Sequence, residues 1–268
     1  WGDQLHQGQS IITTIDSLSR MLSGPACNID WSKYVVFLDE FNSLVDYLME
    51  CSNLQNNRTN TFNNFLTIIR ECKQVICCDA DITGTCKKIL NACGRNDFQM
   101  VQNTYKKFKD VEVSEIFDDN VFINELKTLK QVMIPCDSKT DALSIFETLC
   151  EHWETTLGKQ RELVQDEQWR VQIGDIRICV ITADIPDGSE YILDDYDIVI
   201  FSPKIVYGLD SQNKRPVYGC FKGNSVEPTA WMQMIARNRK PTYIKFVCSK
   251  NYKFRPNRYH EVKDAWEE

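Results

Sequence analysis

Short apolar runs alternate with longer stretches of helical periodicity along most of the 268 residues. Runs of four to eight apolar residues are typical of buried strands, whereas apolar positions three and four apart indicate helices. In the first part of the chain the pattern predicts strands at 10–15, 34–39, 74–80 and 98–103 and helices at 16–22, 41–51, 60–73 and 85–93. Further along it predicts strands at 130–136, 175–182, 196–203, 215–222 and 242–249 and helices at 138–157 and 227–239. Continuous apolar strands separated by helices are typical of parallel sheets that helices cover on both faces.

A charged stretch at residues 104–119 interrupts this alternation, and we place the passage between two domains there. The predicted fold is α/β, with a first domain over residues 1–112 and a second over residues 113–268. Two domains also suit a chain of this length.

Composition narrows the possible classes of protein. The apolar fraction is 43%, and no apolar run approaches the ~20 residues that a membrane helix needs. A net charge of −7 creates no overall field that attracts nucleic acid, although a local basic surface suffices for binding. The twelve cysteines form no C-x-x-C pair, and several lie in apolar runs, where cysteine packs as a small hydrophobe. We therefore expect reduced thiols and an intracellular, reducing compartment.

Polar residues follow three of the predicted strands at their carboxyl ends, where open parallel sheets bind their ligands. Strand 34–39 runs into Asp39 and Glu40, strand 74–80 into "DADIT", and strand 196–203 into "SPKIVYGLD". Adjacent acids are also common at the start of a helix, because they suit its N-terminal dipole. The pair Asp39–Glu40 therefore has two readings, as the start of the next helix or as part of a cation site.

The same strand ends stand in a defined order with two further segments. The order is "TTIDSLSRM", "FLDEFNSL", "VICCDADIT", "SPKIVYGLD" and "QMIARNR", over about residues 10–240. It resembles the superfamily 2 helicase core, and more narrowly that of the viral replication-origin-binding proteins of herpesviruses and other large DNA viruses. The resemblance implies two tandem RecA-like domains, with ATP and Mg²⁺ as cofactors. It further implies an ATP-dependent DNA helicase or translocase that acts in DNA replication and hydrolyses ATP at the cleft between its domains.

The resemblance also assigns catalytic roles. It implies that Asp39 holds Mg²⁺ through water and that Glu40 orients the water that attacks the γ-phosphate. Gln233, Arg237 and Arg239 match the family's Q-x-x-x-R-x-R pattern, in which the arginines are fingers on the phosphates. Such a finger contributes about 10³–10⁵ in rate in related NTPases. On the predicted helix 227–239, Gln233 and Arg237 lie four residues apart and share a face.

Other matched residues point to nucleotide and nucleic acid. Gly208 and Asp210 match a loop that contacts the nucleotide and the strand. The residues matched to nucleic-acid contact or to coupling are Thr13, Thr14, Ser17, Asp79, Asp81, Thr83, Ser138, Lys139 and Ser202. Each match keeps a plainer alternative, namely a solvated loop acid, a turn glycine, a capping residue or an exposed basic run.

The sequence departs from the family at the phosphate-binding loop. No G-x-x-x-x-G-K-[ST] occurs in the 268 residues, and "LGKQ" at 157–160 lacks the first glycine, the Ser/Thr and a preceding strand. We expect this loop upstream of Trp1 in a longer polypeptide, which leaves the first domain incomplete at its N-terminus and this chain inactive by itself.

The expected partners are DNA, contacted mainly through its backbone as a single strand or a fork, and the remainder of the same polypeptide, where an origin-binding domain would lie. No membrane partner is expected. A viral protein of this type would act in the host nucleus or in a viral replication compartment. Two alternatives remain open: a non-catalytic, degenerate helicase-fold module that binds nucleic acid, and another superfamily 2 DNA motor.

Overall fold

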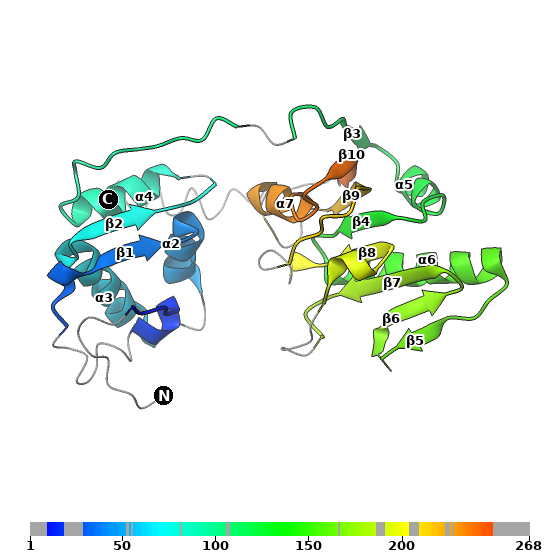
Figure 1. Cartoon of the computed structure of the whole chain (residues 1–268), viewed down its shortest axis with the longest axis horizontal. Coiled ribbons are helices and arrows are strands. Elements are labelled where there is room, and N and C mark those ends of the chain that lie inside the picture. The colour runs from blue at the N-terminus through cyan, green and yellow to red at the C-terminus, as the bar shows by residue number, and fades with distance from the viewer. Residues whose placement is uncertain are drawn as a thin grey trace, which may run out of the picture. The chain divides into compact units, whose positions relative to one another are not determined.

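Figure 1 shows a computed structural model of the chain. It describes residues 10–18, 29–51, 54, 56–80, 82–105, 108–165, 167–185, 191–203, 209–222, 226 and 228–248. The chain divides into two compact units, unit 1 (Trp1–Thr104) and unit 2 (Tyr105–Glu268). The sequence pattern places the boundary slightly later, after residue 112.

Unit 1 contains two parallel strands backed by helices. Strand β1 (Val35–Leu38) pairs with β2 (Gln74–Cys77), with Phe37 opposite Ile76. The helices are α2 (Phe41–Glu50), α3 (Arg58–Glu71) and α4 (Gly84–Ala92), together with the 3₁₀ helices η1 (Ile15–Ser17) and η3 (Trp31–Lys33).

One face of the β1–β2 pair builds the core of unit 1. Side chains alternate across a strand, so Leu38 is buried with Phe41 and Ile69 from the helices, whereas Val35 and Phe37 on the other face are 52% and 61% exposed. The expectation of helices on both faces is therefore wrong for the described part of unit 1, because α2, α3 and α4 all pack into the core on the Leu38 side.

The described part of unit 2 is built on an eight-stranded sheet with the order β3-β10-β9-β4-β8-β7-β6-β5. Neighbouring strands from β3 to β7 in this order are parallel, while β5–β6 and β6–β7 are antiparallel. The strands are β3 (Val113–Ile116), β4 (Val132–Pro135), β5 (Glu162–Val164), β6 (Glu167–Ile173), β7 (Ile176–Ile181), β8 (Ile198–Phe201), β9 (Arg215–Phe221) and β10 (Pro241–Cys248). The helices are α5 (Asp119–Leu126), α6 (Lys139–Leu157), α7 (Pro228–Ile235) and the 3₁₀ helix η5 (Leu193–Asp195).

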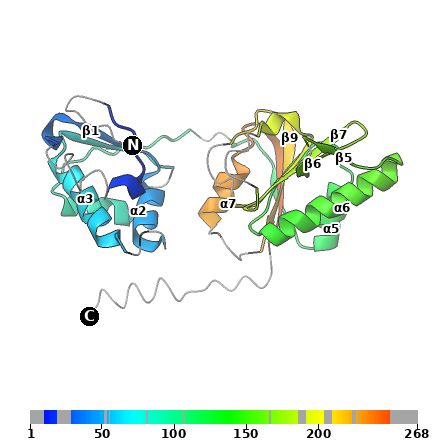
Figure 2. The ribbon, with the colours of Figure 1, turned by 90° about the horizontal axis from the view of Figure 1, so that it is seen from below.

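Helices cover both faces of this sheet, with α5 and α6 on one side and α7 on the other (Figure 2). In β8, Ile198 and Ile200 pack into the core with α5 and α6, whereas Val199 and Phe201 pack into the core with α7. Burial on both faces explains why this strand is a continuous apolar run instead of an alternating one.

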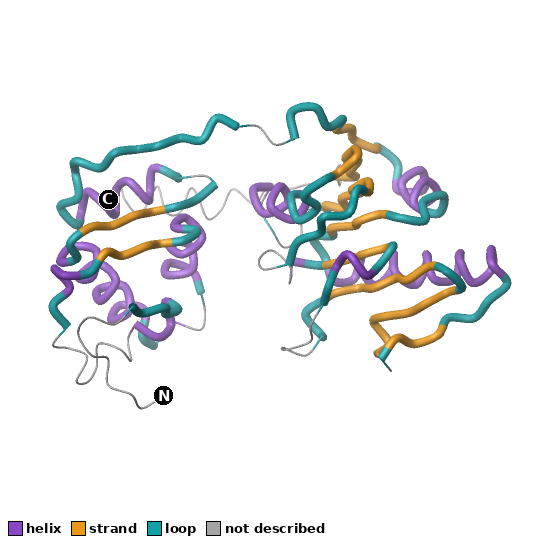
Figure 3. Tube along the Cα trace, viewed as in Figure 1, coloured by secondary structure: helices purple, strands orange, loops and turns teal. Residues whose placement is uncertain are grey.

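Two predicted strands are wrong. Residues 10–14 have no regular structure and lead into η1, and residues 98–103 lie in the loop that follows α4 (Figure 3). A run of strand-forming residues becomes a strand only where a neighbour takes up its backbone groups. Thr13 instead donates a hydrogen bond to the carbonyl of Thr14, and Val101 is 85% exposed.

The sequence pattern also missed elements. Strand β3 lies inside the charged stretch reserved for the passage between domains, and α5 and the β5–β6 hairpin were not predicted. The predicted helix 16–22 lies mostly outside the described residues. The remaining predicted strands and helices are confirmed, with their ends shifted by a few residues.

Two further features hold for the described residues of both units. Within the described ranges, no helix combines the length and the apolarity that crossing a membrane requires. The cysteines in the same ranges are all free, and most of them are buried.

Candidate functional site

The acid pair of unit 1 forms the turn between β1 and α2. Asp39 is exposed, and Glu40 adopts φ 50° and ψ 52°, a left-handed conformation that costs a non-glycine residue about 1–2 kcal/mol. Glu40 is the N-cap residue of α2, yet its side chain makes no capping hydrogen bond. Phe41 N–H donates to the carbonyl of Cys78 at 3.1 Å, which ties this turn to the end of β2. The pair does open a helix, but the Glu40 carboxylate is not used to cap it.

Asp79, at the end of β2, provides the cap for α2 from a distant part of the chain. Its Oδ2 accepts the Asn42 N–H at 2.6 Å, and Thr83 Oγ1 donates to Asn42 Oδ1 at 2.7 Å. The alternative of a merely solvated loop acid is therefore wrong for Asp79, which joins the two strand ends. Asp81 lies outside the described residues.

In unit 2 the structure brings Asp210, Arg237 and Arg239 together. Arg237 Nη1 donates to Asp210 Oδ1 at 3.2 Å, and Arg239 donates to Asp210 Oδ2 through Nε at 2.9 Å and Nη2 at 2.6 Å. The Arg237 side chain is only 12% exposed, and its Nε is buried without an acceptor among the described residues. The reading as a solvated basic run is therefore wrong for Arg237. Gly208 lies outside the described residues.

The predicted helix over 227–239 is too long. Helix α7 ends at Ile235, so Gln233, half-buried on α7, does not share a helical face with Arg237. The segment after the helix pairs with another loop: Ser211 N–H donates to the carbonyl of Arg237 and Arg239 N–H donates to the carbonyl of Ser211, both at 2.8 Å. These bonds satisfy backbone groups that a further helical turn would otherwise have used.

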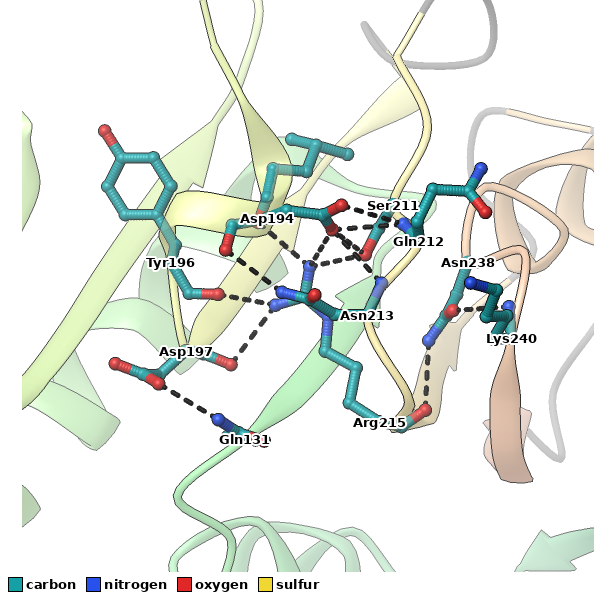
Figure 4. A network of polar contacts seen from close by, with 11 residues as sticks. Gln131, Asp194, Tyr196, Asp197, Ser211, Gln212, Asn213, Arg215, Asn238 and Lys240 are labelled. Atoms are coloured by element: carbon teal, nitrogen blue, oxygen red, sulfur yellow. Dashed lines mark hydrogen bonds and ion pairs between the residues drawn. The ribbon is translucent and has the colours of Figure 1, made fainter.

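A buried polar network around Arg215 adjoins this backbone pairing of Ser211 with Arg237 and Arg239 (Figure 4). Its guanidinium donates to the carbonyls of Tyr196 at 2.6 Å and Leu193 at 2.9 Å and to Ser211 Oγ at 2.8 Å. Burial lowers the pKa of Arg215. Asn238 is fully buried, and its Nδ2 donates to the carbonyl of Arg215 at 2.9 Å.

Asp194 is the acid of this network. Its carboxylate accepts hydrogen bonds from Ser211 Oγ at 2.6 Å and from the backbone amides of Gln212 and Asn213, and it lies 3.8 Å from Arg215 Nη2. Burial by itself raises the pKa of Asp194, but the hydrogen bonds, with a smaller contribution from Arg215, outweigh it and the pKa lies below its usual value. The carboxylate therefore stays ionised and its acceptor sites are used.

Three residues matched to nucleic-acid contact lie just beyond strands of unit 2. Ser138 caps α6 through a hydrogen bond from the Asp141 N–H at 3.3 Å, and Ser202 is only 2% exposed. Lys139 is 45% exposed and forms an ion pair with Asp184 at 2.5 Å. Lys139 therefore presents a positive charge to solvent, whereas Ser138 is used as a helix cap and Ser202 is buried.

The polar residues before unit 1's first strand form a local cluster. Thr13 and Thr14 are exposed and Ser17 is half-exposed. The hydroxyls of Thr14 and Ser17 lie 3.2 Å apart, in the capping turn of η1. Their role in binding nucleic acid stays a prediction.

Taken separately, the two units each offer part of what Mg²⁺ and a polyphosphate require. No cluster of three metal-ligating side chains occurs among the described residues. Mg²⁺ in nucleotide sites takes one or two protein carboxylates and completes its shell with phosphate and water, and the exposed Asp39 suits that single-ligand role. The buried Arg237 Nε suits a phosphate oxygen, but the sequence contains no phosphate-binding loop to cradle the triphosphate.

Sequence reasoning missed Asp194, Arg215 and Asn238. An arginine at the first position of an apolar strand is usually exposed, so the sequence gives no signal that Arg215 is buried. Asn238 offers the only hint, because it separates two arginines that were already matched to a function.

The chain shares its fold with solved helicase structures, and its α/β architecture matches that of tandem RecA-like domains. The chain is similar to S. cerevisiae Dbp5 L327V bound to Gle1 H337R and IP6, with a TM-score of 0.54 and 11% identity over 99% of this chain and 65% of that one. It is also similar to the DUF1998 helicase MrfA bound to DNA, with a TM-score of 0.53 and 11% identity over 96% of this chain and 35% of that one.

A third similar structure is Mycobacterium smegmatis helicase Lhr bound to ssDNA and AMP-PNP, with a TM-score of 0.51 and 9% identity over 88% of this chain and 31% of that one. The chain spans less than two thirds of the length of each of these proteins. No protein-family model matches the sequence, and no curated protein matches it.

Proposed function

We propose that this chain is the motor core of an ATP-dependent DNA helicase or translocase of superfamily 2, of the replication-origin-binding type. The observation that carries the proposal is the group Asp210, Arg237 and Arg239, in which two guanidiniums share one carboxylate and a buried donor of Arg237 has no acceptor among the described residues. Guanidinium forks bind carboxylate and phosphate oxygens alike, so a phosphate can replace Asp210 as their partner.

Phosphoryl transfer requires positioning and neutralisation of charge, and each unit contributes residue types that can supply them. In the proposal, Glu40 orients the attacking water and Arg237 and Arg239 stabilise the negative charge on the transferred phosphoryl group. Asp39 holds Mg²⁺, which neutralises phosphate charge when bound. The left-handed backbone of Glu40 supports this assignment, since strained residues persist where the surrounding structure holds them and cluster at functional sites.

DNA as the substrate and replication as the process rest on the order of the sequence motifs. Among the similar structures, Lhr is bound to ssDNA, MrfA to DNA, and another Dbp5 structure to RNA and ADP BeF3. The exposed Lys139 and the hydroxyls of Thr13 and Thr14 are the proposed contacts to the nucleic-acid backbone.

The missing phosphate loop favours a second candidate, a non-catalytic helicase-fold module that binds nucleic acid. Without a loop of backbone amides and a lysine, a triphosphate has no cradle. We therefore propose that the 268-residue chain alone does not hydrolyse ATP.

The two candidates are separated by the ATPase activity of the full-length polypeptide, measured with and without single-stranded DNA, single-stranded RNA and forked duplex. We expect DNA-stimulated hydrolysis and unwinding of the fork. We expect Glu40→Gln and Arg237→Ala each to lower the hydrolysis rate at saturating ATP by about 10³-fold or more. Hydrolysis that is stimulated by RNA but not by DNA would refute DNA as the substrate.

Matched controls make the same chemical changes on exposed positions of unit 2, namely Glu151→Gln and Arg177→Ala. Both are expected to keep wild-type turnover. Wild-type turnover in the Glu40 and Arg237 variants would refute the site, and nucleic-acid binding without any hydrolysis by the full-length protein would establish the non-catalytic candidate.

A further inference from the structure

The two finger arginines flank a buried asparagine. Asn238 is 0% exposed, whereas Arg237 and Arg239 on either side of it both reach Asp210. Asn238 forms an isolated parallel bridge with Ser211, directly after a turn in which the Arg237 and Asn238 amides donate to the carbonyls of Met234 and Ile235. The Asn238 side chain is thus held in the interior, while the guanidiniums of its two neighbours, Arg237 and Arg239, meet at Asp210.

The opposite side of the bridge repeats this arrangement. Ser211 is 0% exposed, and Asp210 immediately before it is outward, with its side chain 36% exposed. The two buried side chains, Ser211 and Asn238, are therefore the direct sequence neighbours of the three charged side chains of the site, which meet at Asp210. We name Ser211 and Asn238 the anchor pair.

Arg215 holds both members of the anchor pair. Its Nη2 donates to Ser211 Oγ at 2.8 Å, and its backbone carbonyl accepts from Asn238 Nδ2 at 2.9 Å (Figure 4). Asn238 Oδ1 in turn accepts the Lys240 N–H at 3.0 Å, which fixes the chain just after Arg239. Asp194 accepts the Ser211 hydroxyl at 2.6 Å.

We infer that the anchor pair, held by Arg215, is a positioning device that fixes the register and direction of Arg237 and Arg239 relative to Asp210. Its catalytic consequence rests on the proposed function, whereas its structural consequence does not. A finger displaced by about 1 Å loses about 10²-fold in rate. Loss of an anchor is therefore expected to lower kcat for ATP by about 10–10²-fold, with a smaller change in KM than in kcat.

The structural consequence is tested on the 268-residue chain by hydrogen exchange resolved to peptides over 209–213 and 236–240. The variants are Asn238→Ala, Asn238→Asp and Ser211→Ala. Asn238→Asp keeps the size and the acceptor but removes the donor to Arg215, so a space-filling role predicts that it is tolerated. The positioning role predicts faster exchange of the Ser211 and Arg239 amides in all three variants.

Asn124→Ala is the matched control, because it makes the same substitution at an exposed position of α5. Slow hydrogen exchange in β9 and β10 verifies that unit 2 stays folded in each variant. If Asn238→Ala unfolds unit 2, the test is made with Ser211→Ala. Unchanged exchange in the bridge of the folded variants, or a tolerated Asn238→Asp, overturns the inference.

The catalytic consequence is tested on the full-length polypeptide with the same variants, by kcat and KM for ATP. A selective fall in kcat in the anchor variants and not in Asn124→Ala supports the inference. Faster exchange in the bridge combined with no ATPase in the wild type supports the positioning device and refutes the proposed function. Wild-type kcat in a variant whose bridge is loosened overturns the catalytic part of the inference.

Discussion

Replacing Arg215 by methionine tests the buried network of unit 2 through stability alone. The Arg215 side chain is 1% exposed, and its guanidinium donates hydrogen bonds to three backbone carbonyls and one hydroxyl. Methionine keeps an unbranched apolar stem of similar reach but has no donor. The change therefore removes the hydrogen bonds while leaving much of the packing in place.

The expected loss follows from the acceptors that stay buried. The bonds from Arg215 to the carbonyls of Tyr196 and Leu193 are buried, and each acceptor left unsatisfied costs about 1–3 kcal/mol. Asp194 keeps its bonds from Ser211 and two amides, but loses its nearest cation. Part of this loss is offset, because the methionine variant no longer has to bury a charged guanidinium. We expect a net loss of about 3–5 kcal/mol, the range for removing one partner of a buried pair.

The assay is urea unfolding followed by peptide-resolved hydrogen exchange, so that β8 and β9 report on unit 2 and β1 reports on unit 1. For a denaturant slope of about 2 kcal/mol per M, the midpoint of unit 2 should fall by about 2 M and that of unit 1 should not move. Arg177→Met is the matched control, because Arg177 is exposed, and it should cost less than about 1 kcal/mol. A loss for Arg215→Met as small as that of the control would refute the reasoning.

Two further predictions concern Glu40 and Asp194. Glycine relieves the left-handed strain at Glu40, so unit 1 of Glu40→Gly should be about 1 kcal/mol more stable than that of Glu40→Ala; equal urea midpoints of β1 would contradict the strain. Because the folded pKa of Asp194 is lowered, its stabilisation is complete above the unfolded value of about 3.9 and is lost as the pH falls through the folded pKa. The stability difference between wild type and Asp194→Asn should therefore shrink below about pH 4, and a difference that stays constant from pH 7 to pH 3 would argue against this role.

The elements that the sequence predicts well are those whose burial is uniform. In β8 every residue is buried, and its unbroken apolar run is typical of a strand covered on both faces. Residues 98–103 also include strand-forming side chains, such as Phe98 and Val101, but have no strand partner, and Val101 stays exposed. Strand-forming residues alone therefore do not make a strand, because pairing depends on neighbouring segments that a single segment does not encode.

The residues of the candidate site also fall into those that could be predicted from the sequence and those that could not. Asp210, Arg237 and Arg239 could be named in advance because their residue types and order match a known chemistry. Arg215 and Asn238 could not, because their importance comes from being buried and hydrogen-bonded, and burial of a polar side chain is decided by contacts far apart in the chain. The same holds for Asp79, which caps a helix that begins 38 residues before it at Phe41.

In both units, polar contacts between distant segments fix the strand-end residues. In unit 1, Asp79 caps α2 in place of Glu40, and the Glu40 carboxylate is left out of the cap although its backbone is strained. In unit 2, the buried Arg215 hydrogen-bonds to Ser211 and Asn238, the bridge residues next to Asp210, Arg237 and Arg239. Replacing both members of a buried ion pair by apolar side chains is often neutral or stabilising, so stability alone does not require a pair such as Arg215 and Asp194. Hydrogen bonds, however, fix direction as well as distance, and direction is what two guanidiniums that share one carboxylate require.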